Sequence, residues 1–431
     1  MWLLLGGLGL LTVIGALVYF LVLAPAARPL TVPGSLIDSK MSNYAVDRPI
    51  VNSLSGRLTA NLQSSQGLVT WYQQENREKA VPAAKSTSLD ATDQILYGIW
   101  LVEQGDKSAF KTWRKGFQDY FASPDGLIYE TRQLAAANSD TTATPAAAGL
   151  TEANLSEAEL AATSWPDTLL YLRALAMAYS RWPQAELDRA ERATLASLAR
   201  VTGDSLAADQ HTVIPTPAPT VDPGATPTPR PTATPTPDPS LPVEAIIQLR
   251  SLDLLTLQAM GALDSRFQAR YDEALALVEG GLISDELPLY AASYFPKNNG
   301  YVRFEGTLPV VDLESSLLVA LHLAEVGHLD PRTLSWLNEH LLNDGALYTT
   351  YHIAQGQATS SEESLVGYAL TARIARITGQ EVLYQKAVER LQWHLATSST
   401  SQVRGAIFRQ TENEVVSMTA RDNIWALLSF S

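Results

Sequence analysis

Cysteine is absent from the 431 residues, so the chain has no disulfide, no thiolate nucleophile and no cysteine-bound zinc. Basic residues are also few: 31 Lys and Arg stand against 45 Asp and Glu, which gives a net charge of −14. That charge argues against nucleic acid as a partner and against docking on anionic lipid headgroups. The six histidines are scattered, and no glycine-rich phosphate loop or nucleophile-turn motif occurs. We therefore expect no metal and no cofactor.

Hydrophobic residues, by contrast, make up 46% of the chain, enough for a large core. Residues 2–23 form an uninterrupted apolar run that would span ~30 Å as a helix, the thickness of a bilayer's hydrocarbon core. We predict a membrane anchor there; the alternative is a signal peptide cleaved near Ala24-Pro25-Ala26. Arg28 and Lys40 follow the run, which favours a cytoplasmic body, whereas the Pro/Thr-rich composition further along is commoner in exported proteins. We expect the soluble part to be extracytoplasmic.

Two low-complexity segments interrupt the rest of the chain. Residues 212–242 alternate proline with threonine, alanine and aspartate, so they must be extended and solvated. Residues 134–157 are predicted to form a long surface loop. We predict an anchor over 1–24, a short linker over 25–42, and one domain over 43–431 that contains both segments as insertions. The alternative is two unrelated helical domains joined by the proline-rich segment.

The domain repeats a unit of an amphipathic helix, a glycine turn and a more apolar helix that opens with Ser, Thr or Asp. We expect the turn glycines to adopt the left-handed conformation; they are Gly67, Gly126, Gly280-Gly281, Gly345 and Gly405. The apolar helices start near Ser88, Ser164, Ser251, Asp312, Ser361 and Thr419. Because these helices are apolar on nearly every side, they suit an inner ring, and the amphipathic helices suit an outer ring. The sequence therefore predicts an all-α fold, an (α/α)6 toroid of six helical hairpins.

The first apolar helix carries a distinctive pattern. Residues 92–98 read Thr-Asp-Gln-Ile-Leu-Tyr-Gly, followed by an apolar run, Gly105-Asp106, Phe110, Trp113 and then Asp-Gly-Leu at 125–127. With this order of landmarks and six hairpins, the chain resembles the six-hairpin (α/α)6 glycosidase superfamily. Within it, the chain is similar to divergent family-8 glycoside hydrolases, including relatives encoded beside bacterial exopolysaccharide synthases. That family reads Ser-Glu-Gly-Gln-x-Tyr-Gly here, so its glutamate, glycine and glutamine are replaced.

The resemblance implies a glycosidase with one carboxyl group that protonates the leaving oxygen and one that activates water. It places the acid at Asp93, with Asp90 one helical turn earlier as an alternative, and the base or sugar-contacting group at Asp167. It also implies inversion, for which the two carboxyl groups stand ~6.5–9.5 Å apart. Other acids near inner-helix starts are predicted to contact substrate: Asp312, Glu362 and Glu363. The competing explanation is that each acid only caps a helix N-terminus.

Aromatic residues occur in or beside the turns that lead to the inner helices. Flat rings cover the apolar faces of pyranose sugars. We therefore predict substrate contacts at Trp71, Tyr72, Tyr97, Tyr129, Trp165, Tyr301, Tyr348 and Tyr351. For each of them the alternative is core packing beneath the loops.

These patterns together predict a membrane-anchored glycoside hydrolase that cleaves a β-linked polysaccharide. The cell's own exopolysaccharide is the candidate substrate, and its synthesis machinery a candidate partner. One alternative is an inactive relative that binds polysaccharide or scaffolds a synthesis complex. Another is a lyase or unsaturated-uronide hydrolase on the same toroid, which arginines in the mouth would favour. The cationic candidates are Arg173, Arg303, Arg373 and Arg421.

Overall fold

The computed structural model describes most of the domain: residues 48–124, 126–134, 163–182, 212–213, 245–261, 265–296, 299–304, 308–410 and 415–430. The predicted anchor, the linker and nearly all of the two low-complexity segments lie outside these residues. Across the described ranges, no helix is both long and apolar enough to cross a membrane.

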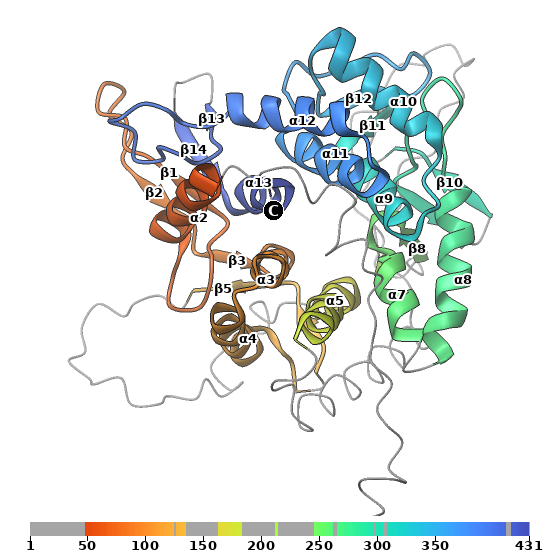
Figure 1. Ribbon diagram of the computed structural model, residues 1–431, viewed down its shortest axis with the longest axis horizontal. Helices are drawn as coiled ribbons and strands as arrows, with labels where there is room; N and C mark the ends of the chain where they lie inside the picture. The colour runs from red at the N-terminus through yellow and green to blue at the C-terminus, as the bar shows by residue number, and fades with distance from the viewer. Residues whose placement is uncertain are drawn as a thin grey trace, which may run out of the picture.

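Six helices form an inner ring. They are α3 (Ala91–Gln104), α5 (Trp165–Arg181), α7 (Leu254–Gly261), α9 (Leu313–Val326), α11 (Leu365–Thr378) and α13 (Ala420–Phe430). Each packs against the next, and α13 packs against α3, so the ring is closed. Figure 1 shows these helices around the centre of the molecule. The predicted (α/α)6 toroid is confirmed.

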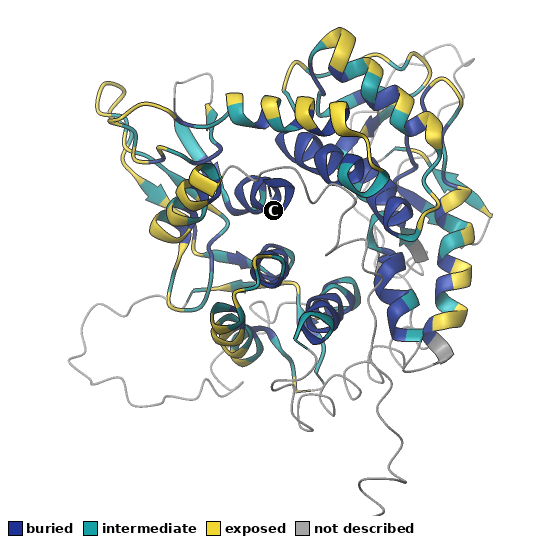
Figure 2. Cartoon of the chain, viewed as in Figure 1, coloured by how far each residue is buried: buried dark blue, intermediate teal, exposed yellow. Residues whose placement is uncertain are grey.

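Amphipathic helices surround this ring. They are α2 (Arg48–Leu62), α4 (Lys107–Phe121), α8 (Ser265–Glu279), α10 (Pro331–Glu339), which continues into the π-helical turn η7 (His340–Asp344), and α12 (Glu381–Trp393). The outer helix expected before α7 lies outside the described residues. In α2 the buried residues Val51, Leu54, Leu58 and Leu62 recur every three or four positions, which places them on one face. Figure 2 shows the same contrast across the molecule, with buried inner helices and outer helices exposed on their outward side.

Short strands connect the helices. They form five small sheets within the described ranges: β13 (Arg409–Gln410)–β14 (Val416–Thr419)–β1 (Trp71–Gln73)–β2 (Ala84–Lys85); β10 (Gly300–Val302)–β9 (Ser293–Phe295)–β8 (Ala245–Gln248)–β7 (Thr212–Val213); β11 (Val310–Asp312)–β12 (Thr350–His352); β3 (Ser88–Asp90)–β5 (Thr131–Gln133); and β4 (Ile128–Tyr129)–β6 (Thr163–Ser164). The pairing of β1 with β14, in antiparallel register Trp71 to Thr419, joins the first and last hairpins of the ring.

The first two residues of the proline-rich segment lie in a sheet with residues that follow the segment. Thr212 pairs with Ile246 and Val213 pairs with Ala245, both antiparallel. The start of the segment therefore lies beside β8, at the edge of the sheet that precedes α7.

The turn glycines divide into two groups. Gly67, Gly126, Gly345 and Gly405 have positive φ, as predicted. The prediction is wrong for Gly280-Gly281, which is not among the positive-φ residues. Here glycine is required by space instead, because a Cβ on Gly280 would meet the hydroxyl of Tyr301 and one on Gly281 would meet Leu249.

Gly98 allows the inner helix α3 and the outer helix α4 to approach each other closely. A Cβ at this buried position of α3 would overlap the ring of Trp113 on α4. We expect Gly98→Ala to lower the free energy of unfolding by about 1–3 kcal/mol, because the indole would have to move within a packed core. The matched control is Gly56→Ala in α2, where nothing lies within 4 Å of the new Cβ. That change should stabilise the protein by up to about 1 kcal/mol through helix propensity. Urea unfolding of both variants checks the opposite signs, and destabilisation by both would contradict the packing argument.

Candidate active site

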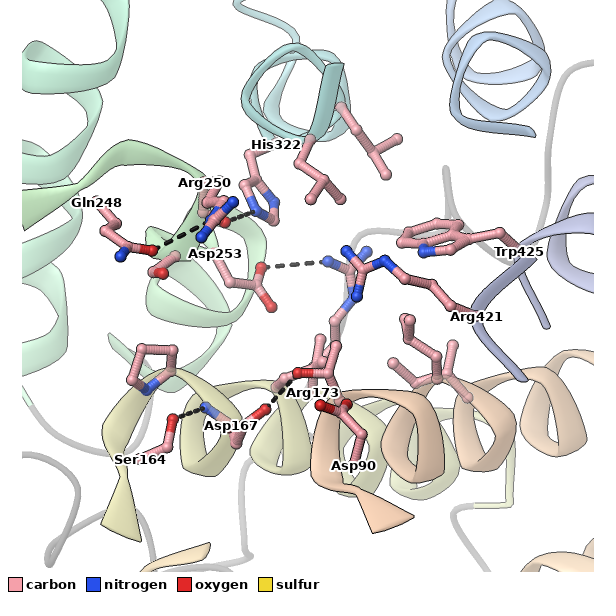
Figure 3. A pocket seen from close by; sticks show the side chains of 18 of the residues that line it. Asp90, Ser164, Asp167, Arg173, Gln248, Arg250, Asp253, His322, Arg421 and Trp425 are labelled. Carbon is pink, nitrogen blue, oxygen red and sulfur yellow. Dashed lines mark hydrogen bonds and ion pairs between the residues drawn. The ribbon is translucent and has the colours of Figure 1, made fainter. Parts of the chain in front are cut away.

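A cavity of about 820 Å³ lies inside the ring. Its lining comes from α3, α5, α9, α11 and α13 and from the segment that leads into α7. Residues immediately before, or in the first turn of, four inner helices share this lining: Asp90, Asp167, Asp253 and Arg421. Figure 3 shows these four side chains around one space. The cavity therefore opens where the inner helices begin.

Asp167 is a buried carboxyl group in the first turn of α5. The Ser164 side chain caps the helix by accepting from the Asp167 N–H, and Pro166 occupies the first turn, where a missing N–H costs nothing. The Thr92 hydroxyl donates to Asp167 Oδ1 at 2.6 Å. Burial raises the pKa of Asp167 to about 6, against the lowering effect of the Thr92 and Ser164 hydroxyl groups, and nearby Asp90 adds to the rise. No hydrogen bond occupies Oδ2 in the described protein, so this atom is available to a ligand.

The two acids of the first inner helix occupy different environments. Asp90 is the N-cap of α3; its Oδ1 accepts from the Asp93 N–H at 3.0 Å, and its side chain lines the cavity. Asp93 is 4% exposed and does not line the cavity. Its Oδ1 is buried and has no hydrogen-bond partner among the described residues. Burial, with the charge of Asp90, raises the pKa of Asp93 well above its usual range.

The raised pKa of Asp167 has a consequence for stability. An acid with pKa 3.8 when unfolded and about 6 when folded holds its proton more tightly in the native state. The contribution of Asp167 to stability is therefore complete below about pH 4 and is lost as the pH rises towards 6, by about 3 kcal/mol in all. We expect Asp167→Asn, which cannot titrate, to lose this component. Urea unfolding at a series of pH values checks it, and identical pH profiles for wild type and variant would contradict the assignment.

An ion network forms one wall of the cavity. Arg173 donates to Asp253 Oδ1 at 3.2 Å and to Glu325 Oε1, and all three residues are buried. Thr256 gives Asp253 two further bonds. Burial alone would raise the pKa of Glu325, but Arg173 and His322 outweigh it and lower the pKa to about 2. These charges are consequently fixed by one another rather than free for chemistry.

Asp253, His322 and Glu325 also have the composition of a metal site. Their possible ligand atoms lie within 4.8 Å of one another, and His322 donates its other ring nitrogen to the Arg250 carbonyl, as metal-bound histidines do. However, the Arg173 guanidinium already bonds both carboxylates. It supplies the positive charge that a cation would bring, and we assign no metal to this cluster.

Three of the predicted cationic candidates line the cavity, and each is neutralised. Besides Arg173, Arg373 makes two bonds to Glu103, at 2.7 and 3.0 Å, and Arg421 is paired with Glu314. Arg303 is exposed and does not line the cavity.

Of the predicted aromatic contacts, only Trp165 lines the cavity, with the unpredicted Trp425. The other predicted residues do not line it. Trp71 lies exposed in β1, Tyr72 donates to Gln402, Tyr97 stacks on Trp100, Tyr129 lies under Arg132, Tyr301 donates to the Leu277 carbonyl, and the Tyr348 N–H donates to the Tyr351 hydroxyl.

The three predicted acids also lie outside the cavity lining: Asp312 caps α9, Glu362 pairs with Arg409, and Glu363 accepts from Tyr368, Arg390 and His394. The substrate contacts of these aromatic and acidic residues stay predictions.

Several cavity residues were not predicted from the sequence, among them Glu130, Arg250, Glu325 and Trp425. Glu325 gave a signal, because it is an acid in the last turn of a largely apolar inner helix. Glu130 follows the aromatic turn residue Tyr129 directly, which also could have drawn notice. Arg250 and Trp425 resemble ordinary helix-start and helix-interior residues, and nothing local distinguishes them.

The fold is shared with known structures. No protein-family model matches the chain, and no curated protein matches it in sequence. Among solved structures, it is similar to a novel alpha-amylase from Clostridium perfringens, with 21% identity, 89% of this chain and 96% of that one covered, and a TM-score of 0.65. It is also similar to PssZ from Listeria monocytogenes, with 14% identity, 88% and 94% covered, and a TM-score of 0.55. A cold-adapted family 8 xylanase shares 10% identity over 90% and 91% of the two chains, with a TM-score of 0.51. At these identities the likeness establishes a toroid resembling that of the family-8 glycoside hydrolases.

Proposed function

We propose that the chain is a glycoside hydrolase that cleaves a β-linked polysaccharide, with Asp167 as general acid and Asp90 as general base. The observation that carries the proposal is the pair of cavity-facing carboxyl groups in unequal environments. Asp167 is buried with its pKa raised to about 6, whereas Asp90 is half-buried at a helix N-terminus. Unequal environments are what acid and base roles require of two similar groups.

Each carboxyl group has one oxygen committed to the protein and one available. Asp167 Oδ1 is fixed by Thr92 and Asp90 Oδ1 by the Asp93 N–H, so both side chains are oriented before a substrate arrives. Asp167 Oδ2 would give its proton to the leaving glycosidic oxygen, and Asp90 Oδ2 would accept a proton from the attacking water. This division implies inversion, which the anomeric configuration of the first product would reveal.

The cavity offers aromatic surface for sugar rings. Trp165 and Trp425 line it on α5 and α13. An aromatic ring in a cavity suits the apolar face of a sugar ring. An alpha-amylase and a family 8 xylanase both share this fold, so the test includes an α-linked polymer beside the β-linked ones.

The test is release of reducing ends by the full-length protein in mild detergent. The polymers are β-glucan, xylan, chitosan, starch and the extracellular polymer of the source cell. We expect cleavage of at least one β-linked polymer. Cleavage of starch alone would overturn the β-linkage, and cleavage of none would overturn the hydrolase.

One observation favours a second function, polysaccharide binding without catalysis. Asp93, which the family resemblance designates as the acid, does not line the cavity. An inactive binder would retain a polymer on an affinity gel and release no reducing ends from it.

The proposal includes a location. Residues 2–23 would anchor the protein in a membrane, with the toroid on the extracytoplasmic side, beside the machinery that makes an exopolysaccharide. The apolar length of this run supports an anchor. Membrane fractionation followed by protease treatment of intact cells tests both points. A toroid that is protected until the cells are lysed would contradict the extracytoplasmic placement.

A further inference from the structure

Arg250 differs from every other arginine in the cavity. Arg173, Arg373 and Arg421 each bond at least one carboxylate. Arg250 lines the same cavity but has no carboxylate partner among the described residues. No described carboxylate is therefore paired with its positive charge.

The position of this charge is fixed by neutral groups. Arg250 Nε donates to Gln248 Oε1 at 3.1 Å, and Nη1 donates to Ser315 Oγ at 2.8 Å. Its carbonyl accepts from His322 Nε2 at 3.0 Å, which also holds the backbone in place. The second terminal nitrogen, Nη2, makes no hydrogen bond within the described protein. A guanidinium that is held still, half-buried and left uncompensated is preorganised for an anionic ligand.

Arg250 also lies at the end of the cavity where the candidate acid and base stand. It belongs to the 3₁₀ turn η5 (Leu249–Ser251), which leads into α7, as Asp90 leads into α3. Figure 3 shows Arg250 and Asp167 on opposite sides of the space. A sugar that reaches Asp167 would therefore have Arg250 within the same cavity.

We propose that Arg250 recognises an anionic substituent on a sugar residue, so that the polymer taken by this cavity is an acidic polysaccharide. The inference rests on the proposed function and specifies its substrate class. Carboxylate and sulfate groups share the chemistry that a guanidinium selects, because both present anionic oxygens to the N–H groups of Nη2. A neutral polymer would leave the charge of Arg250 unpaired in a partly dehydrated site, which costs binding energy.

The experiment compares matched oligosaccharides on the full-length protein. The probes are a cello-oligosaccharide, the same chain oxidised at C6 to glucuronate, and the same chain sulfated at C6. Binding is followed by calorimetry, with the change in the protein's tryptophan fluorescence as an independent readout. The variants are Arg250→Gln, which loses the charge, and Arg250→Lys, which keeps it. Arg77→Gln, which removes an equal charge from an exposed loop, is the control.

We expect wild type to bind a charged chain at least about tenfold more tightly than the neutral one, because a hydrogen bond between two charged groups is stronger than one between neutral groups. Arg250→Gln should abolish the preference, Arg250→Lys should retain part of it, and Arg77→Gln all of it. Comparing the glucuronate with the sulfate identifies the substituent. Equal affinity for neutral and charged chains, no binding of either charged chain, or a preference that survives in Arg250→Gln would overturn the inference. A binding preference without cleavage of any polymer would instead overturn the hydrolase and leave the Arg250 subsite standing.

Discussion

Asp167→Asn should lower kcat/KM for polysaccharide cleavage by about 10²–10⁴-fold, the range for losing a general acid. Asparagine has the shape of aspartate and can still accept the hydrogen bond from the Thr92 hydroxyl, so the site should keep its geometry. In the wild type, kcat/KM should decline as the pH rises above about 6, because Asp167 then loses the proton that it must donate. Initial rates of reducing-end release across pH measure both effects. The residual activity of the variant should lack that decline.

Three further variants separate catalysis from capping. Asp106 caps α4 as Asp90 caps α3, but it is exposed and does not line the cavity. Asp106→Asn should keep the wild-type kcat/KM. The kcat/KM of Asp90→Asn should fall towards that of Asp167→Asn, although asparagine also caps helices. In Asp93→Asn the loss of kcat/KM should be far smaller. A loss in Asp93→Asn as large as in Asp167→Asn would return the acid role to Asp93, as the family resemblance implies, and contradict the role given to Asp90.

Arg173→Met should destabilise the protein by about 3–5 kcal/mol, because it leaves Asp253 and Glu325 buried without their shared cation. The difference in the free energy of unfolding between wild type and variant should become smaller at acid pH. The pKa of Glu325 is lowered from 4.5 to about 2, so its contribution is complete above pH 4.5 and is lost as the pH falls towards 2. The variant already lacks this contribution, so its free energy of unfolding decreases less than that of wild type as the pH falls. Urea unfolding at neutral and acid pH measures both quantities.

A surface pair provides the comparison. Arg270 bonds Glu273 one turn away, and the glutamate side chain is 63% exposed. Arg270→Met should change the free energy of unfolding by no more than about 0.5 kcal/mol. If Arg173→Met cost no more than this control, the buried network would have no role in stability.

Much of the fold could be predicted because local sequence patterns indicate it. Each inner helix is apolar on nearly every side and has a capping residue before it, and each of these signals lies within one segment of chain. The glycine turns show the limit of such reasoning. The left-handed conformation follows from the residue type alone at Gly67, but the need for glycine at Gly280 comes from Tyr301, some twenty positions away.

Only part of the candidate site could be predicted from the sequence, for the same reason. The sequence placed Asp90, Asp93 and Asp167 at helix starts, and the family pattern favoured Asp93 over Asp90. Which of the two faces the cavity depends on the rotation of α3 within the ring, and tertiary packing sets that rotation. Arg250 is a stronger case, because what distinguishes it is that no described carboxylate pairs with it, and no local pattern can reveal that.

The most direct test of the central claim is to measure new reducing ends and unsaturated uronide absorbance in one digest of an acidic β-linked polymer by the full-length protein. Asp167→Asn is run beside it. The proposal predicts reducing ends without unsaturation, formed by wild type and lost in the variant. Unsaturated products would identify a lyase. No new ends at all, or ends that Asp167→Asn forms at the wild-type rate, would contradict a hydrolase whose acid is Asp167.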